Sequence, residues 1–270
     1  MSLASSLSKV AFCLRLARTP SSFLQLVLQS RAAQRRAGRA AASKNQPTEY
    51  LLNLANAPNS TTLRTNAGDF NILYEIFWQQ AYHLPQLQGG AFGTVIDVGA
   101  NVGLAALYFM EKFPVTRLVC VEPEPANFQV LQRNLHGTIA VAVQAALDAT
   151  DGTVKIDSSP QAYNARVSAA TGTVEVAAIS MPSLLQSQQL DWVDLLKIDI
   201  EDYEQQVFVD DCAWLAQIGV LLIEIHSPVS QQVVRQAVQE QGFSWEQAAG
   251  KQAQTGLFVA RNPRQRPNTY

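Results

Sequence analysis

The sequence has no acidic residue before Glu49, whereas eight of its 20 basic residues lie in that stretch. The chain therefore divides into a basic segment, residues 1–46, and a remainder with a negative net charge. An enzyme that binds nucleic acid normally carries a basic stripe along its binding face. The acidic remainder thus argues against nucleic acid as a partner and favours a small-molecule substrate.

Cysteine is scarce. Cys13, Cys120 and Cys212 are far apart and form no C-x-x-C pair. This spacing argues against a disulfide-dense fold and against the common zinc and thiol-redox motifs, and it indicates a reducing compartment. Because Cys120 lies inside an apolar run, we expect it to be a small buried side chain.

Long apolar runs are also missing. No stretch of 18 uncharged apolar residues exists, which argues against a membrane-spanning helix. In residues 1–46 apolar side chains recur at helical spacing, and Arg15 and Arg18 interrupt what would otherwise resemble the core of a secretory signal. The segment fits a loosely docked extension, a helix on an anionic membrane surface, or a transit peptide. The expected location is cytoplasmic, with membrane association or an organelle as the corresponding alternatives.

What is present is a globular composition, with 47% hydrophobic and 16% charged residues in a chain of 270. From residue 94 onward, short apolar runs alternate with helical segments, as is typical of a mostly parallel, doubly wound sheet. The sequence predicts an α/β, Rossmann-like domain over residues 94–270. A helical cap over residues 47–93 and the N-terminal helical extension precede it.

The periodicity also predicts the individual elements. The expected strands are residues 94–98, 117–122, 140–147, 193–200, 220–226 and 256–260. The expected helices are residues 104–113, 126–136, 203–215 and 230–241. Two strands at 153–157 and 173–181 have turn signals and no helix between them, which predicts a β-rich insertion. An aromatic stripe in residues 65–82 is expected to pack in the core, or alternatively to line an acceptor pocket. It comprises Phe70, Leu73, Tyr74, Phe77 and Trp78.

A glycine-containing turn, running from Asp97 to Gly103, follows the first expected strand. A strand, a glycine turn and a helix bring backbone N–H groups and a helix N-terminus against a ligand. Gly99 can make the tight turn, while Gly103 permits close packing of the following helix. Asp97, Gly99, Ala100, Asn101 and Gly103 are therefore predicted to hold a nucleotide-type cofactor.

Two features of this turn separate S-adenosylmethionine from a nicotinamide dinucleotide, the cofactor of the alternative oxidoreductase. The dinucleotide motif G-x-G-x-x-G would need glycine at Asn101 and a small residue at Leu104. Asp97 would repel a diphosphate, whereas it suits the ammonium or the sulfonium of S-adenosylmethionine, in direct contact or through water. The turn therefore favours S-adenosylmethionine.

The next strand ends in the run Val121-Glu122-Pro123. At this edge of the sheet the Glu122 carboxylate is expected to accept hydrogen bonds from both ribose hydroxyls and to disfavour a 2′-phosphate. Pro123 is assigned to the same site. Asp148, after the third expected strand, is predicted to accept from the adenine amino group, with an ordinary turn aspartate as the equal alternative.

These motifs, with Leu195 to Glu201 and Leu222 to His226, make the chain resemble the FkbM family of methyltransferases over roughly residues 64–260. The resemblance implies the class I methyltransferase fold and methyl transfer, usually to a hydroxyl oxygen. The expected acceptor is a hydroxyl of a small metabolite, a sugar or a lipid-linked molecule. The family usually has glycine where this chain has Asp202. Because of this substitution, the acceptors of family members are a weaker guide to this chain than their fold is. The substitution is also the one feature that supports a non-catalytic binding module.

The candidate catalytic residues end two neighbouring strands. Asp199 and Glu201 lie two residues apart, so both point toward the crevice and are the leading candidates for a base. His226 has an ordinary pKa of about 6.5 that suits proton removal, and a structural hydrogen bond to a carboxylate is its alternative. With Glu224 these residues could instead surround a divalent metal, but a salt-bridge network accounts for them, so no metal is assigned. Lys197 is expected to pair with a carboxylate.

Overall fold

The computed structural model describes residues 3–36, 47–54, 60–157, 166–167, 172–249 and 256–264. Seven strands form the main sheet, in the order β12-β13-β11-β10-β3-β4-β5. Their bounds are β3 Thr94–Val98, β4 Arg117–Val121, β5 Ala140–Val143, β10 Val193–Ile198, β11 Ile218–Glu224, β12 Ser244–Gln247 and β13 Leu257–Arg261. All neighbours from β11 to β5 are parallel, and β13 is antiparallel to both of its neighbours.

The order of the strands reverses between β3 and β10. The chain runs outward from β3 to β5 and then returns to build β10 and β11 on the other side. In doubly wound sheets ligands bind outside the carboxyl ends of the strands at such a reversal. The expected α/β architecture is thus confirmed, and the topology places a binding site at the ends of β3 and β10.

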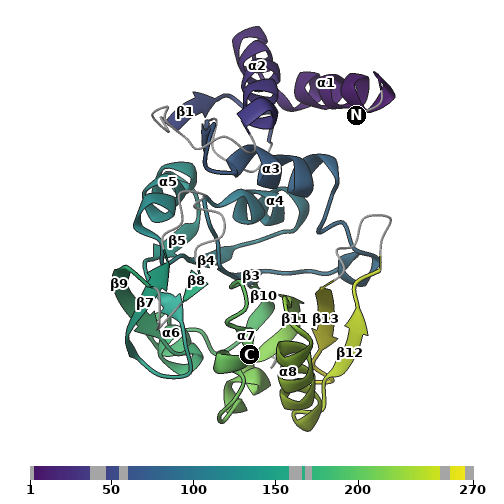
Figure 1. Ribbon diagram of the computed structural model, residues 1–270. Helices are drawn as coiled ribbons and strands as arrows, with labels where there is room; N and C mark the ends of the chain where they lie inside the picture. Colours follow the sequence, from purple (N-terminus) through teal and green to yellow (C-terminus); the bar gives the residue numbers. More distant parts are fainter. Residues whose placement is uncertain are drawn as a thin grey trace.

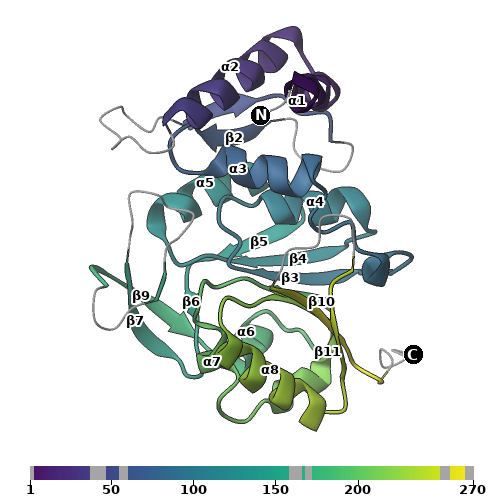
Figure 2. The same ribbon diagram turned by 45° about the vertical axis from the view of Figure 1, so that its right-hand side comes forward.

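The strands are buried on both faces because successive residues point in opposite directions. In β3, Val95 belongs to one hydrophobic core and Ile96 to the other, and Leu222 and Ile223 of β11 divide in the same way. Figure 2 shows α3, α4 and α5 on one side of the sheet and α6, α7 and α8 on the other. Cys120 is fully buried in the first core, as expected.

The helices that follow β3 and cover the sheet are α4 Leu104–Lys112, α5 Pro125–Leu135, α6 Met181–Ser187, α7 Glu204–Val207 and α8 Pro228–Glu240. Three of them, α5, α6 and α8, begin at a side-chain cap. Glu124 accepts a hydrogen bond from a backbone N–H in the first turn of α5, and Ser180 and Ser227 do the same for α6 and α8. Each of these caps is followed by proline within the first two helical positions, where the missing N–H has no helical partner to lose.

The predicted β-rich insertion is present as a second sheet, in the order β6-β9-β7-β8. Its strands are β6 Ala146–Leu147, β7 Gly152–Asp157, β8 Arg166–Val167 and β9 Val174–Ile179. The single strand expected over residues 140–147 is divided, because β5 joins the main sheet while β6 pairs with β9. The end of this segment therefore turns away from the main sheet beside the site.

The helix expected over residues 203–215 is wrong in extent. α7 ends at Val207, and a short 3-10 helix, η4, covers Ala213–Gln217. Between them the Asp211 carboxylate accepts a hydrogen bond from the backbone N–H of Ala213. Such a local side-chain bond offers the backbone an alternative to helix. α6 and β12 were not expected from the periodicity.

The first part of the chain forms a helical hairpin, α1 Leu3–Leu16 and α2 Pro20–Arg36 (Figure 1). It packs against β1 Pro47–Tyr50, β2 Thr61–Arg64, and the helix α3 Asp69–Leu73, which continues as the π-helix η1 Tyr74–Trp78. Phe12 and Leu26 are buried in the first core. The Lys9 ammonium lies 4.8 Å from the centre of the Tyr74 ring. The hairpin is thus integrated into the core of the domain.

Candidate functional site

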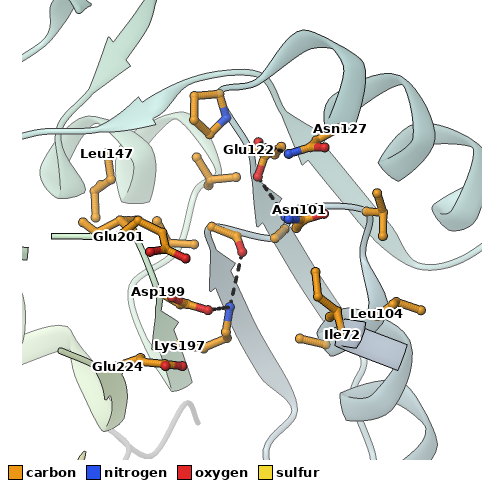
Figure 3. Close-up of a pocket in the computed structure, with 18 of the residues that line it drawn as sticks. Ile72, Asn101, Leu104, Glu122, Asn127, Leu147, Lys197, Asp199, Glu201 and Glu224 are labelled. Carbon is orange, nitrogen blue, oxygen red and sulfur yellow. Dashed lines mark hydrogen bonds and ion pairs between the residues drawn. The ribbon is translucent and has the colours of Figure 1, made fainter. Parts of the chain in front are cut away.

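A cavity of about 290 Å³ opens at the carboxyl ends of β3, β4 and β10 (Figure 3). Its walls come from η1, from the turns after these strands, from β6 and from the end of β11. The lining residues are Ile72, Glu75, Ile76, Tyr82, Val98, Gly99, Ala100, Asn101, Val102, Leu104, Ala105, Val121, Glu122, Pro123, Asn127, Ala145, Ala146, Leu147, Lys197, Asp199, Ile200, Glu201, Tyr203 and Glu224. The cavity therefore lies at the reversal of the strand order.

The turn after β3 is shaped by two glycines with different tasks. Gly99 has φ +73°, and a Cβ there would lie 1.8 Å from the carbonyl oxygen of Asp199. Gly103 has φ +86° and a Cβ there would lie 2.8 Å from Cδ1 of Leu131 on α5. Gly99 thus lets two strand ends meet beneath the cavity, while Gly103 packs against a helix and does not line it.

Glu122 lies at the opposite side of the cavity from Asp199 and Glu201, which follow β10 (Figure 3). Its carboxylate accepts hydrogen bonds from the backbone N–H groups of Asn101 and Glu124, at 2.8 and 2.9 Å, and from Nδ2 of Asn127 at 3.3 Å. Burial raises the pKa of Glu122 to about 7, against the lowering effect of these bonds. A carboxylate has about four acceptor positions. One therefore remains for a ligand hydroxyl.

An apolar surface lies next to Glu122. Pro123, Ala146 and Leu147 line it, together with Val121. Asp148 does not line the cavity: it accepts a hydrogen bond from the hydroxyl of Tyr203 at 3.2 Å and another from the N–H of Ala149. Its contact with the cavity is thus through Tyr203, which does line it.

Asp97 is withdrawn from the cavity. Its side chain is completely buried, and Oδ1 lies 3.0 Å from the ammonium of Lys197. The same ammonium lies 3.3 Å from the carbonyl oxygen of Gly99 and 3.7 Å from Asp199. Burial alone would lower the pKa of Lys197, but Asp97, Tyr82 and Asp199 outweigh it and raise that pKa. The pairing expected for Lys197 is confirmed. Asp97, which we expected to face the ligand, faces the ammonium of Lys197 instead.

Carboxylates gather on the remaining wall, where Asp199, Glu201 and Glu224 lie close to Lys197 (Figure 3), together with Glu75 of η1. Burial, and next to it the charge of Asp199, raise the pKa of Glu224 to about 8 and that of Glu75 to about 7. Several of these groups cannot all be ionised cheaply at short range. Near neutral pH the carboxyl groups of Glu224 and Glu75 therefore keep protons that exposed carboxyl groups would lose.

The conformation of the turn after β10 accounts for Asp202 at the position where the family usually has glycine. Glu201 has φ +50° and Asp202 has φ +69°, both in the left-handed region. Glycine adopts this region without cost, and aspartate is one of the few other residues that tolerates it. Asp202 thus keeps the backbone conformation that the glycine of the family would adopt, and its N–H is held by Oε1 of Glu204 at 3.1 Å.

His226 lies behind the acidic wall and does not line the cavity. Its Nδ1 lies 2.8 Å from Oε1 of Glu204, and its Nε2 lies 3.7 Å from Glu201 and 3.9 Å from Glu224. The hydrogen bond with Glu204 raises the pKa of His226 to about 9, although burial opposes this. With this pKa the imidazole is a cation at neutral pH. The ordinary pKa that we expected of His226 as a base is therefore shifted upward by its surroundings. The alternative considered for His226, a structural hydrogen bond to a carboxylate, is the contact that the structure contains.

Of the four residues considered for a metal, Asp199, Glu201 and His226 can each offer one ligand atom within 4.8 Å of the others. A metal would need the neutral imidazole. The bond to Glu204 favours the protonated ring instead. The alternative to a metal is the set of ion pairs that these side chains make, Asp199 with Lys197 and His226 with Glu201 and Glu204.

Four lining residues come from the segment 65–82, and the sequence pattern did not single them out. They are Ile72, Glu75, Ile76 and Tyr82. The aromatic stripe itself packs in the first core, as expected. The signal that could have identified this wall is Glu75, an acidic residue inside an otherwise apolar helical pattern. A π-helix, which often marks a functional site, carries it.

The cavity lies at the switch point of a Rossmann-like sheet, with a carboxylate at the end of the second strand, an arrangement typical of enzymes that bind an adenosine-containing cofactor. A family model described as "Methyltransferase FkbM domain" matches residues 97–245, which include both turns and His226. The chain belongs to the FkbM family of methyltransferases, and it is an S-adenosylmethionine-dependent enzyme. The oxidoreductase alternative is not favoured.

Three relatives illustrate the similarity. The chain is 29% identical over 182 residues to methyltransferase sdnD of Sordaria araneosa, covering 53% of this chain and 70% of the relative. It is 27% identical to the hexuronic acid methyltransferase AglP of Haloferax volcanii, over 56% of this chain and 63% of the relative. It is 26% identical to the 31-O-demethyl-FK506 methyltransferase FkbM of Streptomyces tacrolimicus, over 63% of this chain and 80% of the relative.

Proposed function

We propose that this enzyme methylates a hydroxyl group of an uncharged acceptor, such as a sugar, another small metabolite or a lipid-linked glycan. The observation that carries the proposal is the division of the cavity into two ends. Glu122 and an apolar surface form one end, and the carboxylates around Asp199 form the other. The names of two relatives, a hexuronic acid methyltransferase and a 31-O-demethyl-FK506 methyltransferase, support a small oxygen-bearing acceptor.

The residues present fit S-adenosylmethionine. Glu122 lines the cavity and has one acceptor position left for a ribose hydroxyl, and Pro123 and Leu147 offer apolar contact to a flat base. The backbone from Gly99 to Asn101 lines the cavity between the two ends. Bound here, the cofactor supplies a methyl group made electrophilic by its sulfonium. Asp97 contributes indirectly, by fixing Lys197 beneath the Gly99 carbonyl.

Asp199 is the proposed general base, with Glu201 as the second candidate. Both line the cavity, and their carboxylates can orient an acceptor hydroxyl and take its proton. Glu224 is less suited, since its pKa of about 8 leaves it protonated at neutral pH. As a cation, His226 takes no proton in this scheme and instead holds Glu204 and faces Glu201.

The charge of the acidic wall restricts the acceptor. Glu75, Asp199, Glu201 and Glu224 line one side of the cavity, and Lys197 is the cation among the lining residues, already paired with Asp97. A carboxylate or phosphate on the acceptor would meet the charges of Asp199 and Glu201 there, and no unpaired cation among the lining residues would offset them. We therefore infer that the acceptor is neutral, in contrast to the acid in the name of the Haloferax relative.

Calorimetry and labelled methyl transfer test this function. S-adenosylmethionine is expected to bind, NAD is not, and Glu122→Ala should weaken cofactor binding by at least about ten-fold with the fold intact. Methyl transfer would be followed with neutral glycosides and matching uronic acids as acceptors. Asp199→Asn should lower transfer about 10²-fold or more while cofactor binding persists.

Glu246→Gln, an exposed carboxylate on β12, is the matched control and should change neither quantity. Preferential methylation of the uronic acids would overturn the neutral acceptor. Transfer that is unaffected by Asp199→Asn would overturn the assignment of the base.

A further inference from the structure

The helical hairpin α1–α2 has an outer face that no other described part of the chain covers. Leu7 and Leu14 of α1 are 64% and 63% exposed, and Leu24 and Leu28 of α2 are 57% and 53% exposed. Among the residues that the structure describes, the other large hydrophobic side chains exposed by more than half are Val209 and Val229. Exposed leucines thus concentrate on this hairpin.

Within each helix the two exposed leucines share one side. Leu7 and Leu14 are seven residues apart, and Leu24 and Leu28 are four apart, which are spacings that repeat one helical face. The inner face is fixed by Phe12 of α1, which is buried in the first core. In Figures 1 and 2 the hairpin forms one end of the molecule, remote from α8. The leucines therefore face outward.

Charge complementarity identifies what would cover this face. Arg15 and Arg31 are exposed, and Arg31 shares the face of Leu24 and Leu28 by its spacing. No acidic side chain precedes Glu49, although eight basic residues do. Leucines beside arginines, without acidic neighbours, are the pattern of helices that lie in the headgroup region of an anionic bilayer. A second copy of this face would bring like charges together, and a protein partner would not require so complete a lack of acidic residues.

We propose that the outer face of α1–α2, formed by Leu7, Leu14, Leu24 and Leu28 with Arg15 and Arg31, binds the surface of an anionic lipid membrane. The hairpin lies on the surface and does not span it, since no helix among the described residues is long and apolar enough to cross a bilayer. Docking of this kind combines the burial of apolar side chains with attraction of arginine to acidic headgroups.

The hairpin is also joined to one wall of the catalytic cavity. The Lys9 ammonium lies over the rings of Tyr74 and Trp78 in η1, and Ser30 of α2 hydrogen-bonds the hydroxyl of Tyr74. Glu75, the next residue of η1, lines the cavity. A membrane bound by the hairpin would therefore lie behind this wall, which suits an acceptor that resides at the membrane.

Vesicle co-sedimentation of the full chain tests the proposal. Binding should be at least about ten-fold stronger to vesicles with about 30% phosphatidylserine than to pure phosphatidylcholine, and salt should weaken it. Leu14→Ser with Leu28→Ser should lower binding at least about ten-fold, and so should Arg15→Glu with Arg31→Glu. Methyl transfer to a soluble acceptor should stay unchanged in both variants.

The matched controls are Val229→Ser with Val209→Ser and, for charge, Arg235→Glu, all exposed side chains outside the hairpin. They should bind vesicles as the wild type does. Failure of the wild type to bind anionic vesicles, or equal binding by the hairpin variants, would overturn the proposal. So would a wild-type dimer in sedimentation velocity that the leucine variant dissociates, because the face would then cover a second copy.

Discussion

The ammonium of Lys197 lies 3.0 Å from Oδ1 of Asp97, and the two side chains are 4% and 0% exposed. The two residues are direct partners in the parallel register of β10 and β3, at the point where the order of the strands reverses. The cavity is therefore built over a buried ion pair that joins its two central strands.

Removing one member of this pair should cost far more than removing both. Lys197→Met leaves Asp97 buried without a counter-charge, and we expect a loss of about 3 to 5 kcal/mol in the free energy of unfolding. The double variant Lys197→Met with Asp97→Leu should recover most of this loss, because no charge is left unpaired. Urea denaturation of the two variants measures the difference, and equal stability of both would contradict the assignment.

Gly99→Ala and Gly89→Ala form a matched pair, since both glycines have φ +73°. At Gly89 a Cβ meets nothing within 4 Å, so only backbone strain of about 1 to 2 kcal/mol is expected. At Gly99 the Cβ would also meet the Asp199 carbonyl oxygen at 1.8 Å. Gly99→Ala should therefore be much less stable and should lose cofactor binding, whereas Gly89→Ala should retain it, as measured by thermal unfolding and calorimetry.

The pair formed by His226 and Glu204 should make stability depend on alkaline pH. His226 titrates at about 9 in the folded protein and near 6.5 when unfolded, so its stabilisation is complete below about pH 6.5 and is lost as pH rises through 9. Glu224 acts in the same direction but only up to about pH 8.

Urea denaturation at about pH 8 and about pH 9.5 covers the titration of the histidine. The buried thiols of Cys13, Cys120 and Cys212, whose pKa values are raised by burial, also lower stability over this interval, so the contribution of the histidine is the difference between the wild type and His226→Gln. We expect His226 to contribute on the order of 1 kcal/mol to the loss, a figure reduced for the partial exposure of the imidazole. His226→Gln should remove this contribution. The surface variant His136→Gln should keep it, and an unchanged pH dependence in His226→Gln would count against the proposed charge state.

Glu224 should affect the two forms of the cofactor differently. As pH rises through about 8 its carboxylate becomes charged, which favours the sulfonium of S-adenosylmethionine over the uncharged thioether of S-adenosylhomocysteine. The ratio of the two affinities should increase at least about three-fold between pH 7 and 9. Glu224→Gln should make the ratio independent of pH, and calorimetry of both ligands at the two pH values tests this.

The sequence predicted the elements whose signals are local. The limits of β3 agree with the expected strand, and α4, α5 and β10 differ from expectation by one or two residues at their ends. Of the eleven site residues that the sequence singled out, seven line the cavity: Gly99, Ala100, Asn101, Glu122, Pro123, Asp199 and Glu201. The helix expected after Tyr203 was too long, because Asp211 binds the backbone of Ala213 within it.

Strand periodicity, glycine turns and the carboxylates at strand ends could be read from the chain because each depends on residues that are close in sequence. The charge states of the site could not. Asp97 and Lys197 are 100 residues apart in sequence, and their pairing depends on the register of β3 against β10. His226 and Glu204 are 22 residues apart and meet only because the turn after β10 lies beside the end of β11. Packing in three dimensions therefore decided which carboxylates face the cavity and which are neutralised behind it.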